Sequence, residues 1–168
     1  MDLALLILRL TVGLLVAGHG AQKLFGWFGG HGVTATSGWL GSIGFRPPRA
    51  WALLVASSEF FGGVLFALGL LSPLGSVGIG SAMLMAITKV HWPKGVWASN
   101  GGFELPLTYL AVAVAIGLTG PGAFAGDTFL GLVVPGTITA VGVIVAIALW
   151  VIGLTSSSSQ PQEVKTVR

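Results

Sequence analysis

The stretch LALLILRLTVGLLVAGHGAQKL at residues 3–24 decides the fold class of this chain. A helix needs about 20 predominantly apolar residues to cross the hydrocarbon core of a bilayer, and this stretch has that character. It ends in polar residues and lacks an A-x-A-like cleavage site, so we interpret it as part of the mature protein and not as a signal peptide. The first predicted element is therefore a transmembrane helix.

The composition of the whole chain excludes a soluble protein. Of the 168 residues, 54% are hydrophobic and only 8% are charged, whereas charged residues make up about 25% of an ordinary soluble domain. The 8 Lys and Arg and the 5 Asp and Glu residues cannot cover a water-facing surface. No basic run supports nucleic-acid binding. The absence of Cys excludes disulfides, thiolate metal sites and Cys nucleophiles.

Further apolar runs extend the membrane prediction along the chain. We expect an all-α, polytopic membrane helix bundle that forms one transmembrane domain over residues 1–154. Two runs, 74–90 and 103–119, are close to the lower length limit for a span, and re-entrant segments there would reduce the number of full crossings. The polar, Ser-rich tail at residues 155–168 is expected to be disordered. The five expected spans cover about residues 3–24, 50–71, 74–90, 103–119 and 134–154.

The Lys and Arg residues fall on one side of this five-span arrangement. The opposite side has no Lys or Arg apart from Arg9, which lies within the first span. The positive-inside rule therefore predicts that the basic connections and the C-terminus are cytoplasmic and that the N-terminus faces outward. The basic side contains Lys23, Arg46, Arg49, Lys89, Lys94, Lys165 and Arg168.

A few ionisable residues stand inside the spans or at their ends, where a bilayer makes a charge costly. The helical rise puts them at related depths, so one polar column through the bundle would account for all of them. Structural interpretations stay open: Lys23 can snorkel to the headgroups, His91 can be interfacial, and Glu104 can complement a helix dipole. Glu59, near mid-membrane, either pairs with Arg9 or stays protonated and neutral. The candidate site residues are Arg9, His19, Lys23, Glu59, His91 and Glu104.

These residues belong to a series of short motifs. The series comprises Arg9-Leu10, the stretch HGAQKLFG at 19–26, Glu59 followed by Gly62-Gly63, Leu68-Gly69-Leu70, His91, Gly102 with Glu104, and Gly120-Pro121-Gly122 followed by Asp127. In this order and spacing, over about residues 5–130, the motifs resemble the DoxX family of small bacterial membrane proteins. The resemblance implies a four-helix core in the bacterial cell membrane, and the apolar run at 134–154 adds a fifth span to it.

The resemblance also implies a role. DoxX relatives are named for subunits of thiosulfate:quinone oxidoreductase and of quinol-oxidase-associated complexes, and actinobacterial relatives are linked to membrane complexes that handle oxidative and thiol stress. It therefore implies a subunit of a respiratory or stress-related oxidoreductase system, with an intramembrane quinone-headgroup or proton-handling site. The chain has no Cys and no dinucleotide-binding domain, so partner redox subunits must carry the electrons. The sequence demonstrates no cofactor, and quinone is the candidate that the resemblance suggests. No metal is expected, and a haem held by His19 and His91 is disfavoured.

The alternative is a non-catalytic membrane scaffold, assembly factor or carrier, so the sequence leaves open whether the chain is an enzyme. The patterns Gly13-Ala17-Ala21 and Gly78-Ala82-Ala86 suit tight helix contacts within the chain, with a partner or in a homo-oligomer. A channel or transporter is a weaker third option, because no inverted repeat is visible.

Overall fold

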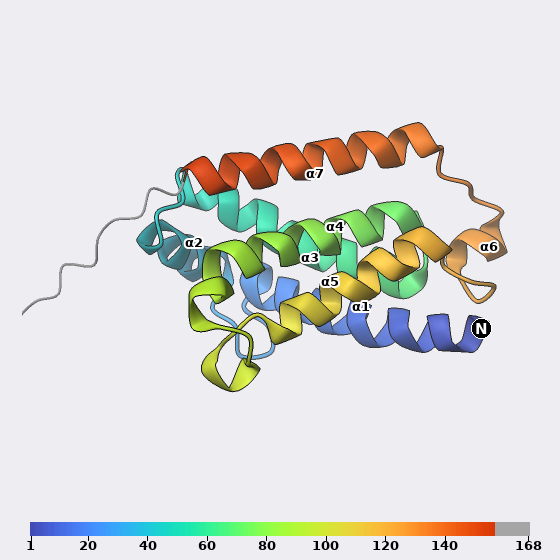
Figure 1. Ribbon diagram of the computed structural model, residues 1–168, viewed down its shortest axis with the longest axis horizontal. Helices are drawn as coiled ribbons and strands as arrows, with labels where there is room; N and C mark the ends of the chain where they lie inside the picture. The colour runs from blue at the N-terminus through green and yellow to red at the C-terminus, as the bar shows by residue number, and fades with distance from the viewer. Residues whose placement is uncertain (157–168) are drawn as a thin grey trace, which may run out of the picture.

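The computed structural model describes residues 1–156, and these residues form a helical bundle that contains no strand (Figure 1). The expected all-α class is therefore confirmed. The tail expected at 155–168 lies outside the described residues, except for Thr155 and Ser156, which belong to the last helix. The α-helices are α1 (Asp2–Phe25), α2 (Gly32–Ser42), α3 (Pro48–Leu68), α4 (Ser72–Ala86), α5 (Glu104–Thr119), α6 (Gly126–Leu130) and α7 (Gly136–Ser156). A π-helical turn, η1 (Ile87–His91), and two 3₁₀ turns, η2 (Trp92–Lys94) and η3 (Ala98–Asn100), separate α4 from α5.

Four helical segments of the described chain are long and apolar enough to cross a membrane. They are Asp2–Phe25, Pro48–Leu68, Ser72–Lys94 and Gly136–Ser156. The third is longer than the expected run at 74–90, because the π-helical and 3₁₀ turns continue the helix beyond α4 to Lys94. The fourth expected span, 103–119, corresponds to α5, which is a shorter apolar helix of 16 residues.

Glycine and proline residues set the helix ends. Gly26 follows the last residue of α1 and Gly69 the last residue of α3, and both glycines adopt the left-handed conformation, with φ of 76° and 63°. After α3, the backbone N–H of Leu70 donates to the Leu65 carbonyl at 2.9 Å, which is the hydrogen bond of a Schellman motif. Pro73 lies in the first turn of α4, where its missing N–H costs no intrahelical bond. The α3–α4 connection is therefore a tight turn.

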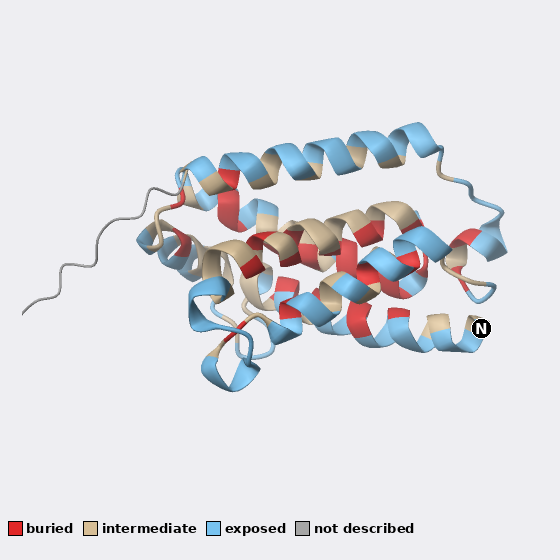
Figure 2. Ribbon diagram, viewed as in Figure 1, coloured by how far each residue is buried: buried red, intermediate tan, exposed pale blue. Residues whose placement is uncertain are grey.

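The central helices pack closely because small residues meet at their interface. α3 contacts α1, α2 and α4, and α4 also contacts α5 and α7. A Cβ added at Gly13 of α1 would lie 2.7 Å from the carbonyl oxygen of Gly63 in α3, so only glycine permits this backbone approach. Figure 2 shows the buried residues gathered between α1, α3, α4 and α5. The main core cluster consists of Val12, Val16, Phe66, Ile79, Ala82, Met83, Ala113 and Ile116.

Two helices stand out from this core. α2 is an 11-residue helix inside the segment that the sequence suggested to be a connection, and it is too short to span a bilayer. Its buried residue Leu40 packs with Phe45, Trp51 and Met85 in a second core cluster. α7 lies along α4, and Gly153 is its one buried residue, so most of its apolar surface faces outward (Figure 2). That surface suits contact with lipid.

Candidate functional site

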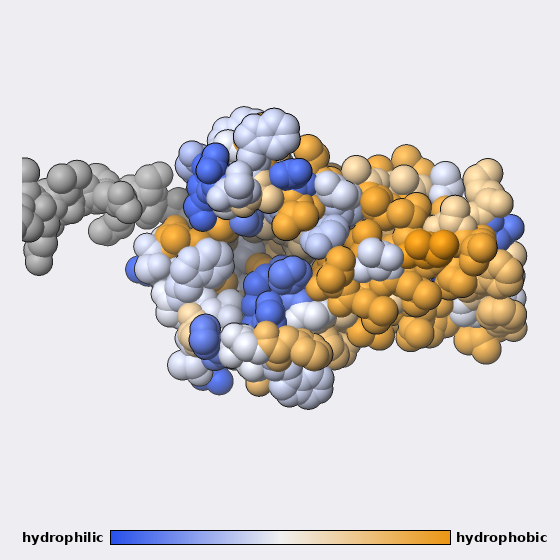
Figure 3. All heavy atoms as spheres, turned by 90° about the horizontal axis from the view of Figure 1, so that it is seen from below, coloured by the Kyte–Doolittle hydropathy of each residue, from blue (hydrophilic) through white to orange (hydrophobic). Residues whose placement is uncertain are grey.

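A cavity of about 270 Å³ lies where the end of α1 meets α2, α3 and the π-helical turn. Its ionisable lining residues are Lys23, Glu59, Lys89 and His91. Its other walls are aromatic and apolar, and include Trp39, Leu40 and Phe45 from α2 and the connection that follows it. Figure 3 shows hydrophilic side chains gathered toward this end of the molecule, whereas the other end is covered by apolar side chains. The cavity therefore combines polar groups with an apolar wall.

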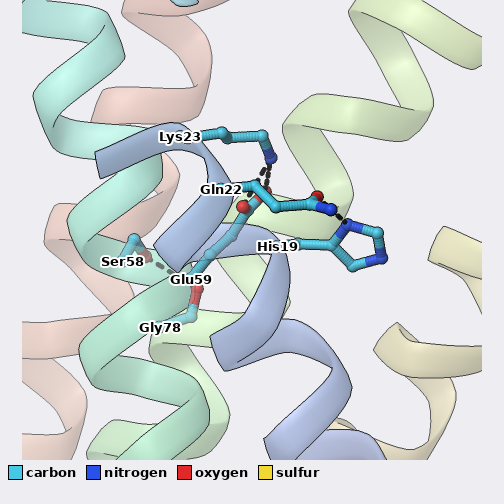
Figure 4. Close-up of polar contacts among 6 residues, drawn as sticks. All are labelled: His19, Gln22, Lys23, Ser58, Glu59 and Gly78. Atoms are coloured by element: carbon cyan, nitrogen blue, oxygen red, sulfur yellow. Dashed lines mark hydrogen bonds and ion pairs between the residues drawn. The ribbon is translucent and has the colours of Figure 1, made fainter. Parts of the chain in front are cut away.

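Lys23 and Glu59 form an ion pair at the edge of the cavity. The Lys23 ammonium group donates hydrogen bonds to both carboxylate oxygens of Glu59 (Figure 4). The side chain of Glu59 is only 3% exposed and that of Lys23 is 29% exposed. A buried carboxylate in an apolar bundle requires such a partner, because desolvation of an unpaired charge costs several kcal/mol. The structure therefore pairs Glu59 with Lys23 and not with Arg9, which was the partner suggested by the sequence.

His91 enters the cavity wall from the π-helical turn. Its Nδ1 lies 2.6 Å from the carbonyl oxygen of Gly101. A carbonyl oxygen only accepts hydrogen bonds, so Nδ1 carries the proton and donates it. Nε2 is then the ring nitrogen that remains for contact with a ligand. π-helical turns of this kind occur frequently at functional sites.

Lys89 is a cavity residue that the candidate site did not include, because it lies at the end of the expected span at 74–90 and was counted only among the residues of the basic side. The helix instead continues past it, and Lys89 lines the cavity. Its Nζ donates to the Leu154 carbonyl oxygen at 3.2 Å, near the C-terminal end of α7. A cation is favourable at that position, because carbonyl groups at the end of a helix lack intrahelical partners.

Three of the expected site residues lie outside the cavity: Arg9, which belongs to a separate cluster, and His19 and Glu104. The Nδ1 atom of His19 lies 3.3 Å from Gln22 Oε1, and the Gln22 amide donates to the carbonyl oxygen of Phe28. In Figure 4 the His19 and Gln22 side chains point away from the Glu59 carboxylate. Glu104 accepts the backbone N–H of Ala98 at 2.9 Å. His19 and Glu104 therefore hold local structure around the site and do not line it.

Arg9 belongs to a second polar cluster, about 20 Å from Lys23 along α1 at 1.5 Å per residue. The guanidinium is 1% exposed, and its Nη2 donates to the Phe124 carbonyl oxygen at 2.7 Å. The carboxylate of Asp127, also buried, accepts the backbone N–H groups of Leu71 and Ser72 and the Ser72 hydroxyl. This cluster holds the start of α4 and the Gly120–Gly126 segment against α1. The single polar column expected from the sequence is thus divided into two clusters at different depths.

Comparison with known proteins identifies the family. The DoxX family model matches residues 4–92, which is more than half of the chain and includes every ionisable residue of the cavity. The comparisons with curated proteins and with solved structures gave no match. By sequence and by its helical membrane architecture, this chain belongs to the DoxX family.

Proposed function

We propose that this DoxX-family membrane protein is a subunit of a respiratory or stress-related oxidoreductase system, and that its cavity binds a quinone headgroup. One observation carries the proposal: the Lys23–Glu59 ion pair, Lys89 and His91 line the same cavity as the rings of Trp39 and Phe45. A quinone headgroup has a flat ring that suits aromatic walls, and carbonyl oxygens that accept hydrogen bonds from ammonium groups such as those of Lys23 and Lys89.

The side chains of the cavity also suit proton transfer. A bound quinone would supply the redox chemistry, since it accepts electrons and protons together. The buried Glu59 carboxylate and the Lys23 ammonium group place a paired acid and base at the cavity wall. The imidazole of His91, whose Nε2 is not engaged by Gly101, is a second group at the cavity that suits proton exchange with a bound quinone. The chain has no Cys with which to bind an iron–sulfur cluster, so the electrons come from a partner subunit under this proposal.

The proposed orientation puts the cavity near the cytoplasmic face of the bacterial cell membrane. Lys23 and Lys89 are cavity residues, Arg46 lies between α2 and α3, Arg49 in the first turn of α3, and Lys94 at the end of η2. The α2–α3 and α4–α5 connections lie at the same end of the bundle (Figure 1). Lys and Arg concentrate in cytoplasmic connections of membrane proteins. The other two basic residues of this set, Lys165 and Arg168, lie outside the described residues.

Quinone titration of the purified protein in lipid nanodiscs tests the proposal. A tailless benzoquinone or naphthoquinone should quench tryptophan fluorescence saturably, because Trp39 lines the cavity. His91→Ala and Glu59→Gln should each weaken binding by about tenfold or more, because the first removes a side chain that lines the cavity and the second removes the carboxylate that holds the Lys23 ammonium group in place. The matched controls His19→Ala and Glu104→Gln change the same residue types outside the cavity, and should retain wild-type affinity.

Two results would contradict the proposal. The first is quenching that rises linearly with quinone concentration in the wild type, as expected from partitioning into lipid. The second is equal affinity in the cavity variants and their controls. Because Glu59→Gln leaves Lys23 without its carboxylate, each variant is first checked for monodispersity, and His91→Ala provides a test that leaves the ion pair intact.

The exposed surface of α7 favours a second candidate function, that of a scaffold for partner subunits. α7 packs along α4, and its side chains Val141 and Ile144 are 60% and 65% exposed. Under this alternative, Ile144→Trp abolishes co-purification of partner subunits from native membranes while tailless quinone binding remains. Unchanged co-purification would exclude this face of α7 as the docking surface.

A further inference from the structure

The polar cavity is one of three hollows that follow one another along the bundle. A narrow slot of about 30 Å³ shares Val55, Ala82 and Met85 with the cavity. A groove of about 330 Å³ shares Ser81 and Ala146 with the slot. The groove is bounded by α4, α5 and α7. The three hollows therefore have common walls in the order cavity, slot, groove.

The order of the hollows is the same along both helices that border them. On α4 and the turn after it, residues 82–91 line the cavity, 81–85 the slot and 73–84 the groove. Lys89, a cavity residue, donates a hydrogen bond to Leu154 of α7. Farther back along α7, residues 146–150 line the slot and residues 139–147 line the groove. The stretch of helix from Lys89 back to Pro73 is about 24 Å long at 1.5 Å per residue. The hollows thus form a track along the helix axes.

The chemistry changes along this track. All four ionisable lining residues lie in the cavity. The groove is lined by no charged residue, and its walls include the aliphatic side chains of Leu84, Leu110, Val114 and Val143. The slot between them is walled by Met85, whose unbranched thioether chain changes rotamer readily. A ligand that fits the whole track must therefore have a polar head and a long apolar chain.

We propose that the groove between α4, α5 and α7 binds the isoprenoid chain of the quinone whose headgroup occupies the cavity. This inference rests on the proposed function, and it specifies the substrate class as prenylated quinones. The groove adjoins the slot and the slot adjoins the headgroup cavity, because each neighbouring pair of hollows shares lining residues, and the groove leads away from the polar end of the bundle toward the apolar end shown in Figure 3. α7, which the DoxX family match at residues 4–92 does not include, supplies one wall of the groove.

Substitutions that fill the groove test the inference without touching the cavity. Gly80→Leu adds a side chain at a position where an added Cβ makes ordinary contact, 3.6 Å from Leu110 Cδ1. Val143→Trp fills the groove from α7, and Val141→Trp, on the outward surface of the same helix, is the matched control. Each protein is titrated in nanodiscs with two probes, a tailless quinone and the same headgroup bearing an isoprenoid chain.

We expect Gly80→Leu and Val143→Trp to weaken binding of the prenylated quinone by about tenfold or more, because overpacking a filled site is costly. Both variants should bind the tailless quinone as the wild type does, and Val141→Trp should bind both probes normally. Unchanged affinity for the prenylated probe in both groove variants, with normal tailless binding, overturns the groove assignment and leaves the headgroup site standing. Failure of the wild type to bind the tailless probe overturns the proposed function and this inference with it.

Discussion

At the scale of single residues, the Lys23–Glu59 pair controls both the stability and the chemistry of the site. Glu59 lies in the middle of α3 and is almost completely buried, so its negative charge depends on the ammonium group from α1. Breaking a buried pair leaves one desolvated charge behind, whereas replacing both partners removes the charge altogether. Single and double substitutions of the pair should therefore differ in the free energy of unfolding.

Lys23→Met should lower the free energy of unfolding by about 3 kcal/mol, because Glu59 would be left unpaired. The double variant Lys23→Met/Glu59→Gln should recover most of that loss, since no buried charge remains. Thermal unfolding in a mild detergent, followed by size-exclusion chromatography, measures both variants. A double variant no more stable than Lys23→Met would show that the pair does not control stability in this way.

At the other end of the bundle, Asp127 is a second buried carboxylate that depends on its hydrogen-bond partners. Asp127→Asn should cost about 1–3 kcal/mol, because the buried carboxylate accepts two backbone N–H groups and the Ser72 hydroxyl at the start of α4. Asp2→Asn is the matched control: its carboxylate also accepts a backbone N–H, from Ala123, but at an exposed position. Equal unfolding midpoints for the two variants would contradict a capping role for Asp127.

At the scale of helices, close contact between α1 and α3 brings Lys23 to Glu59. Gly13 faces Gly63 and Ala67 of α3, so the first of the two small-residue patterns serves contacts within the chain. Gly13→Leu is therefore unsuitable as a probe of partner binding, although the sequence alone suggests that use. The added leucine side chain would separate α1 from α3 within one molecule.

Gly13→Leu should severely reduce the yield of monodisperse protein, because the new side chain meets backbone atoms that cannot rotate away. Overpacking costs about 1–3 kcal/mol even where neighbouring side chains can move. Gly18→Leu, on the same helix, has no atom within 4 Å of its added Cβ and should leave yield and quinone affinity unchanged. Comparable yields for the two variants, measured by size-exclusion chromatography, would exclude tight α1–α3 packing at Gly13.

At the scale of the whole molecule, the sequence predicts the helical membrane class and the importance of Glu59, because an apolar run and a mid-span carboxylate are visible without coordinates. It does not predict the partner of Glu59, since Arg9 and Lys23 share roughly one face of α1 and only the rotation and depth of the helices decide between them. The sequence analysis left Lys89 out of the site because a lysine at the end of an apolar run suits the basic side of the membrane, and it did not predict α2 because that helix is too short to resemble a span.

The orientation of the molecule is a separate prediction, and the Cys-free sequence makes it simple to measure. Ser99→Cys and Ala123→Cys place single thiols at exposed positions on opposite ends of the bundle. A membrane-impermeant maleimide applied to intact spheroplasts should label the Ala123→Cys variant and spare Ser99→Cys until the cells are opened. The reverse pattern would put the basic connections, and the cavity beside them, on the outer face.

The central claim is that the cavity at Lys23, Glu59, Lys89 and His91 binds a quinone headgroup. Its most direct measurement is mass-spectrometric quantification of the quinone that co-purifies with the protein from native membranes in mild detergent, compared between His91→Ala and His19→Ala. We predict stoichiometric quinone in the wild type and in His19→Ala, and its loss from His91→Ala, because only His91 lines the cavity. Equal quinone content in the two histidine variants would contradict the account.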